Sequence, residues 1–157
     1  MRIKLPFINK IFVIGFIDLN RIVIGLDSSS FCEEGEQIIV LDYDRLPLEE
    51  VREDVKRLQR DFGLPTFYIF SSSPGNYHAY CMTCLKFHEV MVIAFASKSD
   101  RKHKNCLLYN KISTVRITRK KGKPSKIKFV EKIPHKGQFR EIPNAEEILM
   151  YVLKNER

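Results

Sequence analysis

The order of apolar and polar positions along the chain predicts strands in its first third. Two runs rich in Ile, Val and Phe, at 11–18 and 21–26, flank Asn20 and predict an N-terminal β-hairpin over 11–26. The nearly continuous apolar run from Gln37 to Leu41 predicts a strand that is buried on both faces. Such burial is typical of a central strand.

Helical periodicity follows. Apolar residues recur at spacings of three and four between Leu48 and Phe62, which predicts an amphipathic helix that begins near Pro47 and ends at Gly63. Cationic residues crowd the stretch 98–105, which we interpret as a basic loop. The same patterns predict further strands at 66–70, 79–82, 107–109, 112–118 and 126–133, and helices at 85–95 and 145–153.

The length of 157 residues allows one domain with a sizeable core, and no linker or repeat indicates a second. We therefore expect a single α+β domain over 1–157, with a mixed or antiparallel central sheet flanked by helices. Its core would span about 36–133, and the hairpin 11–26 and a C-terminal helix 145–154 would be additions to it. The strands at 112–118 and 126–133 would form a hairpin with the basic turn 119–124 at its tip.

Charge is the main deviation in composition. The chain has 27 Lys and Arg against 19 Asp and Glu, a net charge of +8. This balance indicates a polyanionic partner, most simply nucleic acid, although a lysine-rich surface for solubility or for a hot-living host is the alternative. The apolar run 11–17 is too short for a membrane span, and no cleavage site follows it. We expect a cytoplasmic protein with no membrane partner.

Four cysteines bear on the redox compartment and on metal binding. In a chain of this size without a secretion signal, Cys32, Cys81, Cys84 and Cys106 are expected to be buried, inert thiols rather than a disulfide framework. A zinc site built on Cys81, Cys84 and His88 is the weaker alternative, because no second pair completes a tetrahedral set.

Two acids close the strand that begins at Gln37. Asp42 and Asp44 are two residues apart, so on a strand both side chains point to the same side. Adjacent carboxylates favour a compensating cation, and Mg²⁺ or Mn²⁺ is the usual choice where phosphates also bind. The alternative is an ordinary polar strand end with both acids solvated.

A second polar stretch lies downstream. Residues 71–75 read Ser-Ser-Ser-Pro-Gly, and His78 follows just inside the next strand. Small residues let backbone N–H groups approach an anion, and an imidazole beside the turn can donate to a phosphate oxygen. An ordinary hairpin with an idle histidine is the alternative.

Together these two stretches resemble the motifs of the archaeo-eukaryotic primase superfamily, the primase-polymerases. Residues 38–44 look like its first motif, and residues 72–78 look like its second, nearest to the versions carried by plasmids and viruses. The family pattern often has a serine two residues before the histidine, where this chain has Asn76. The order of Asp100, a tyrosine-containing strand and Arg116-x-x-x-Lys120 is similar to the family's third region, with Glu131 as a possible substitute for Asp100.

The resemblance implies an RRM-like β-α-β-β unit and template-directed nucleotide addition with Mg²⁺ or Mn²⁺ in plasmid or viral replication. The implied partners are single-stranded or primed DNA, nucleoside triphosphates and, optionally, a helicase. The implied catalytic and metal-binding residues are Asp42, Asp44 and Asp100. The implied nucleotide-binding residues are Ser72, Ser73, Gly75, Asn76, His78, Arg116 and Lys120. The basic residues expected along the nucleic acid are Lys102, Lys104, Arg119, Lys121 and Lys123.

Two other classes of function stay open. A replication initiator module that keeps the fold would bind nucleic acid without chemistry. A metal-dependent nuclease or nicking enzyme is disfavoured, because His78 has no histidine partner one residue away and His88, His103 and His135 are scattered.

Overall fold

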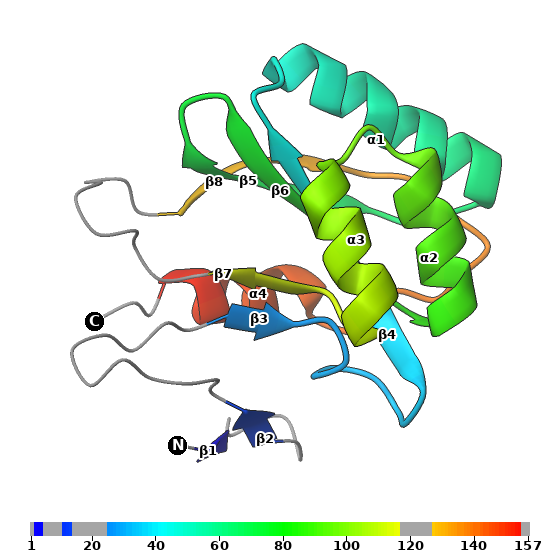
Figure 1. The fold of residues 1–157 in the computed structure, drawn as a ribbon, viewed down its shortest axis with the longest axis vertical. Helices are drawn as coiled ribbons and strands as arrows, with labels where there is room; N and C mark the ends of the chain where they lie inside the picture. The colour runs from blue at the N-terminus through cyan, green and yellow to red at the C-terminus, as the bar shows by residue number, and fades with distance from the viewer. Residues whose placement is uncertain (1, 5–10, 14–24, 117–126, 155–157) are drawn as a thin grey trace.

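A four-stranded antiparallel sheet forms the centre of the molecule (Figure 1). The structure is a computed structural model, and it describes residues 2–4, 11–13, 25–116 and 127–154. The strand order is β4-β6-β5-β8, and each neighbouring pair is antiparallel. The strands are β4 (Glu36–Asp44), β5 (Phe67–Ser73), β6 (Asn76–Lys86) and β8 (Lys128–Ile133).

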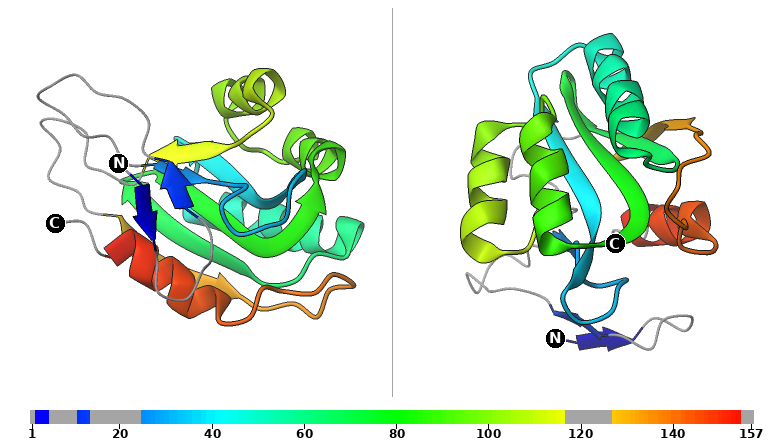
Figure 2. Two further views of the ribbon diagram at one scale, coloured as in Figure 1. Left: turned by 90° about the horizontal axis from the view of Figure 1, so that it is seen from below. Right: turned by 90° about the vertical axis from the view of Figure 1, so that its right-hand side faces the viewer.

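Helices cover both faces of this sheet. One face carries α1 (Leu48–Phe62), α2 (Phe87–Ala96) and α3 (Arg101–Asn110), and the other carries α4 (Ala145–Lys154), as Figure 2 shows. A ribbon of β3 (Gly25–Asp27) and β7 (Thr114–Arg116) packs on the α4 side. A second ribbon pairs β1 (Arg2–Lys4) with β2 (Ile11–Val13). The α+β class and the antiparallel sheet are confirmed.

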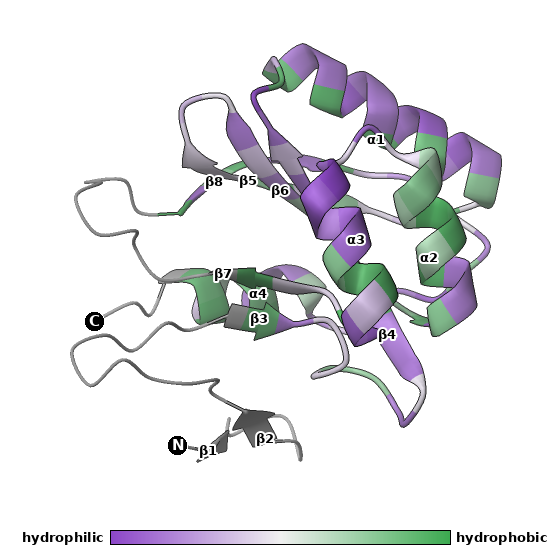
Figure 3. Ribbon diagram, in the orientation of Figure 1, coloured by the Kyte–Doolittle hydropathy of each residue, from purple (hydrophilic) through white to green (hydrophobic). Residues whose placement is uncertain are grey.

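The alternation of side chains along β4 builds two cores. Ile39, Leu41 and Tyr43 pack under α1 and α2, whereas Ile38 and Val40 pack toward α4 and the β3-β7 ribbon. Helix α1 contributes an apolar stripe and keeps its outer surface polar (Figure 3). No helix in the described part of the chain is both long enough and apolar enough to cross a membrane.

Strand β4 is a terminal strand of its sheet and not the central strand that we predicted. Other segments cover its open edge: the Ile38 N–H donates to the Ser28 carbonyl oxygen at 2.8 Å, and Val40 O lies 2.9 Å from His103 Nε2. The Asp100 N–H donates to the Asp42 carbonyl oxygen at 2.6 Å. The apolar run of β4 is therefore buried because these segments cover its edge. A covered edge strand and a central strand have the same apolar pattern, so the pattern alone does not tell them apart.

The predicted helices on either side of the sheet form. Helix α1 follows Pro47 and ends at Gly63, whose φ of 63° allows its N–H to bond back to the Gln59 carbonyl oxygen. Helix α4 begins at Ala145, as predicted. Helix α2 begins two residues later than predicted, because β6 continues to Lys86.

The predicted basic loop 98–105 and the predicted strand 107–109 are wrong, because most of this stretch forms helix α3. Its N-cap is Asp100, and its buried face is made by His103 and Leu107 four residues apart. A stripe of two residues in ten is too narrow to stand out against the surrounding lysines.

The strands of the two predicted hairpins pair with other partners. Strand β7 pairs with β3 and β8 pairs with β5, so the described parts of 112–118 and 126–133 lie in different sheets. Likewise β2 pairs with β1. The turn 119–124 and most of 11–26 lie outside the described residues.

The expectation of free, buried thiols holds for one cysteine only. Cys32 and Cys84 form a disulfide with a Cα–Cα distance of 5.5 Å, so Cys84 is not available as a zinc ligand. Cys81 is free and buried, and burial raises the pKa of its thiol. Cys106 is free and exposed on α3.

Candidate functional site

Asp42, Asp44 and His78 lie on one face of the sheet, near the end of β4. They follow the alternation that places Val40 and Tyr80 toward the α4 side. Asp42 pairs with His78 across β4 and β6, and Asp42 Oδ1 lies 3.6 Å from His78 Nε2. The structure thus brings together the two stretches that the sequence singled out.

The site is open at its acids and closed around its imidazole. Asp44 is exposed and Asp42 is half-buried, whereas His78 is only 5% exposed. The other ring nitrogen, Nδ1, lies 3.4 Å from the Tyr80 hydroxyl. Burial, and secondarily the charge of Asp42, raises the pKa of Tyr80, so this hydroxyl stays protonated at neutral pH.

Hydrogen bonds within the turn between β5 and β6, and from the turn to the β4–α1 connection, hold its conformation. Gly75 has a φ of 74°, which favours glycine, and its carbonyl oxygen accepts from the Leu46 N–H at 3.1 Å. Asn76 Oδ1 accepts from the Arg45 N–H at 3.0 Å, and Asn76 Nδ2 donates to Ser73 Oγ at 2.6 Å. Asn76 therefore ties the turn to the start of the β4–α1 connection. Its contact with a nucleotide stays a prediction, as do those of Ser72, Ser73 and Gly75, which are partly exposed.

The third acid is engaged as a helix cap. The backbone of Asp100 touches that of Asp42, but its carboxylate accepts from the Lys102 N–H at 2.7 Å and the His103 N–H at 3.2 Å. The proposed substitute, Glu131, forms an ion pair with Arg52 of α1, on the opposite face of the sheet. Among the described residues, no three His, Cys, Asp or Glu side chains are grouped to hold a metal ion.

The predicted basic contacts are only partly described. Lys102 is exposed on α3, and Lys104 Nζ donates to the Ser97 carbonyl oxygen at 2.6 Å, while burial lowers its pKa. Arg116 ends β7, opposite Gly25 in the register. Arg119, Lys120, Lys121 and Lys123 lie outside the described residues.

A buried carboxylate contacts β4 on the face of the sheet opposite to the site, and the sequence analysis did not identify it. Asp54 of α1 is 1% exposed and accepts from the Tyr43 hydroxyl at 3.0 Å and from the Lys98 N–H at 2.7 Å. Arg57 donates to its other oxygen at 2.6 Å. The available signal was an acid on the apolar stripe of α1, between Val51 and Val55.

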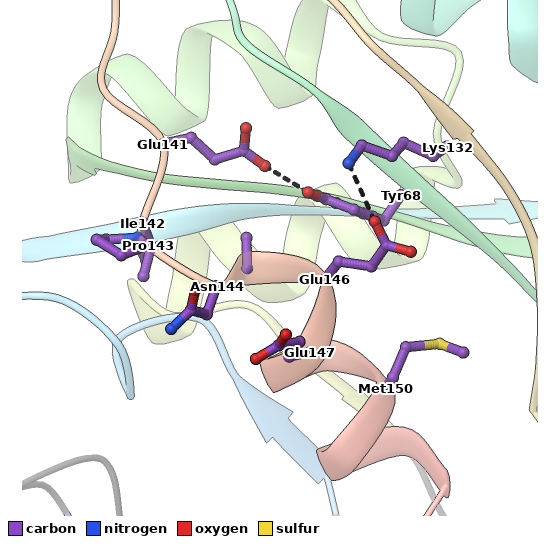
Figure 4. Close-up of a pocket in the computed structure, with 10 residues that line it drawn as sticks. Tyr68, Lys132, Glu141, Ile142, Pro143, Asn144, Glu146, Glu147 and Met150 are labelled. Carbon is purple, nitrogen blue, oxygen red and sulfur yellow. Dashed lines mark hydrogen bonds and ion pairs between the residues drawn. The ribbon is translucent and has the colours of Figure 1, made fainter.

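A cavity of about 690 Å³ lies on the same sheet face, beside the start of α4 (Figure 4). The Tyr68 hydroxyl donates to Glu141 at 2.6 Å, and burial, followed by this bond, raises the pKa of Tyr68. Lys132 is paired with Glu146 at 3.0 Å. With three glutamates against one lysine on its walls, this cavity is a poor site for a triphosphate. The lining residues are Tyr68, Lys132, Glu141, Ile142, Pro143, Asn144, Ala145, Glu146, Glu147 and Met150.

The electrostatics thus separate two regions of one sheet face: a strand end with two acids and an imidazole, and an acidic cavity next to α4. The first offers hard oxygen ligands beside a nitrogen donor, the donor set that suits a metal-bound phosphate. Compared with known proteins, the chain matches no family model, no curated protein and no solved structure.

Proposed function

We propose that the chain is a metal-dependent nucleotidyltransferase of the primase-polymerase type, which adds nucleotides under the direction of a template in plasmid or viral replication. One observation carries the proposal: Asp42 and His78 pair across β4 and β6, and Asp44 lies one step further along the same face. Mg²⁺ is commonly held by one or two protein carboxylates, with phosphates and water as the other ligands. Two carboxylates therefore fit the ion that the reaction needs.

The connection of the strands supports the RRM-like part of the proposal. Helix α1 links β4 to β5, and β6 lies between these two strands, antiparallel to both. This is a split β-α-β arrangement, with β5 and β6 joined as a hairpin. This order supports the proposal of the β-α-β-β unit that the resemblance implies.

Each residue has a defined part in the proposed reaction. Asp42 and Asp44 would hold the divalent ion, which when bound neutralises the triphosphate and activates the attacking 3′-hydroxyl. His78 would donate to a phosphate oxygen, with its ring held between Tyr80 and Asp42. The backbone N–H groups of Ser72, Ser73 and Gly75 would add donors to the same phosphates.

The test is template-directed incorporation on a primed DNA in the presence of Mg²⁺ or Mn²⁺. Asp42→Asn and Asp44→Asn should each lower the rate by at least about 100-fold, as does loss of a group that stabilises developing charge. Asp61→Asn, on the exposed side of α1, is the matched control and should keep wild-type activity. A wild-type protein that incorporates nothing, or an Asp42→Asn variant of full activity, refutes the enzymatic proposal.

A second candidate is a non-catalytic module of a replication initiator. It is favoured by the capping role of the Asp100 carboxylate and by the position of Glu131, which leave two acids at the site. This candidate predicts DNA binding that weakens steeply with salt and is indifferent to divalent ions and to Asp42→Asn. Calorimetry with a nucleoside triphosphate and Mn²⁺ separates the two, because only the enzyme should bind the nucleotide in a metal-dependent way.

A further inference from the structure

The outward side of helix α3 carries basic and polar side chains. His103 and Leu107 are the buried residues of this helix, and they face the protein. Successive residues of an α-helix are about 100° apart, so four other side chains fall within one arc of about 100° on the opposite side. All four are exposed, and we call them the α3 face: Arg101, Lys102, Asn105 and Tyr109.

The positive charge of the α3 face is not neutralised by neighbouring acids. Residues 98–111 contain five Lys or Arg against one acid, Asp100. The Asp100 carboxylate accepts from the backbone N–H groups of Lys102 and His103, and it pairs with no cationic side chain of the described residues. Arg101 and Lys102 likewise form no ion pair within the described part of the chain. The face therefore presents two uncompensated cations to solvent.

Cations at this end of a helix are not favoured by the stability of the helix itself. The first turn favours acids, because its backbone N–H groups carry partial positive charge. Helices α1, α2 and α4 each have at least one glutamate in the first turn, whereas α3 has Arg101 and Lys102 there. The two cations and the helix dipole therefore add in the same direction, and a polyanion is the partner that they favour.

The α3 face begins beside the strand that carries the candidate site. Helix α3 lies on the outside of the molecule next to α2, as Figures 1 and 2 show, and its first turn is hydrophilic (Figure 3). This turn follows Asp100 directly, whose N–H donates to the Asp42 carbonyl oxygen at 2.6 Å. The end of α3 that holds the two cations is therefore the end next to Asp42.

We propose that the α3 face binds double-stranded DNA, with α3 lying in the major groove. This groove is about 12 Å wide and admits an α-helix. Arg and Asn side chains form paired hydrogen bonds with base edges in the groove, and Lys and Tyr side chains contact phosphate oxygens. The inference deepens the proposed function and rests on it for one point, that the duplex is the primed part of the template.

Charge variants test the surface. The anisotropy of a labelled duplex of about 20 base pairs, two turns of DNA, measures binding without divalent ions. Arg101→Ala/Lys102→Ala should weaken binding by about 10- to 100-fold and lower the slope of log affinity against log salt by about 1 to 2. Lys56→Ala/Arg60→Ala removes the same charge from exposed positions of α1, and this matched control should stay within about 3-fold of the wild type. A control that loses as much affinity as the α3 variant overturns the inference.

Contact at α3 is tested by fluorescence, because the chain has no tryptophan. Tyr109→Trp places a single tryptophan on the α3 face, at a position that is 81% exposed, and its emission should change as the duplex binds. Tyr151→Trp, at a 51% exposed position of α4, is the matched control and should keep its emission. Tyr109→Trp emission that stays constant when anisotropy shows saturation contradicts the proposed contact.

Competitors test the identity of the partner. An unlabelled single strand of the same sequence and polyglutamate should both displace the duplex poorly. A duplex with bulky groups on the C5 atoms of its pyrimidines, which face the major groove, should bind more weakly than the plain duplex. Displacement by the single strand at the concentration of the duplex contradicts duplex binding in favour of single-strand binding, and displacement by polyglutamate contradicts it in favour of an acidic protein partner.

Two outcomes separate this inference from the proposed function. Duplex binding that depends on Arg101 and Lys102, together with a lack of incorporation by the wild type, supports the surface and refutes the enzyme. Incorporation together with wild-type duplex affinity of Arg101→Ala/Lys102→Ala refutes the surface alone.

Discussion

Replacement of Asp54 by alanine should destabilise the protein strongly, although this residue lies outside the candidate site. The carboxylate of Asp54 joins three segments: Tyr43 of β4 through its hydroxyl, Lys98 through its backbone N–H, and Arg57 within α1. Tyr43 stands between the two acids of the site, and Lys98 begins the approach to Asp100. The network therefore holds β4, α1 and the start of α3 in one arrangement.

The magnitude follows from the groups left without a partner. In Asp54→Ala the Tyr43 hydroxyl and the Lys98 N–H lose their acceptor, and each buried orphan costs about 1–3 kcal/mol. Arg57 contributes little, because its side chain is 37% exposed and keeps Asp61 and the Ala96 carbonyl oxygen as partners. We expect a loss of about 3 to 5 kcal/mol, in the range measured when one member of a buried pair is removed.

Urea denaturation followed by far-UV circular dichroism measures this loss. In a Tyr43→Phe background the orphan hydroxyl is absent, so the same Asp54→Ala change should cost about 1 to 2 kcal/mol less. Asp61→Ala, on the exposed side of the same helix, should lie within about 0.5 kcal/mol of the wild type. An Asp54→Ala variant less than about 1 kcal/mol below the wild type, or a Tyr43→Phe background without effect, contradicts a stabilising role for this network.

Three further predictions concern other parts of the fold. The Cys32–Cys84 disulfide closes a loop with a sequence separation of 52 residues, so the Cys32→Ser/Cys84→Ser double variant should lose up to about 4 kcal/mol of unfolding free energy in urea denaturation. In the wild type, mass spectrometry after rapid alkylation should find both cysteines unalkylated. Burial lowers the pKa of His103 in the folded state from its ordinary value of 6.5. The neutral imidazole therefore contributes its full stabilisation above pH 6.5, and this contribution is lost as the pH falls through the lower pKa of the folded state. His103→Gln should make the urea midpoint of unfolding decline less between pH 7 and pH 5. A Cβ on Gly137 would collide with the backbone around Gly63, so Gly137→Ala should lower stability by about 1–3 kcal/mol in urea.

Local patterns predicted those elements whose formation depends on local causes. Helix α1 is set by its apolar stripe and by Gly63, whose left-handed conformation ends it, and both are visible in the sequence. The β5–β6 hairpin likewise follows from Gly75 in its turn. The pairing of Asp42 with His78 depends on more than this turn, because it also requires β6 to lie beside β4 in the sheet.

The missed features depend on contacts between distant segments. The disulfide joins cysteines 52 residues apart, and nothing near Cys32 indicates that β6 will end beside it. Helix α3 has two buried residues, and one of them, His103, is buried because it packs against the open edge of β4. The backbone of Asp100 contacts that of Asp42, but its carboxylate caps the start of α3, a role that depends on where that helix begins; metal binding by Asp100 stays a prediction.

Strand β4 shows why the candidate site and the core cannot be separated. A slip of one residue in its register would turn both acids into the core under α1 and would move Tyr43 to the side of His78. The Tyr43–Asp54 bond opposes that slip from one face, and the bonds of Val40 and Asp42 to His103 and Asp100 oppose it from the open edge. The tyrosine between the acids is thus the residue that specifies where the acids point, and its partner on α1 is as much a condition for the site as the acids themselves.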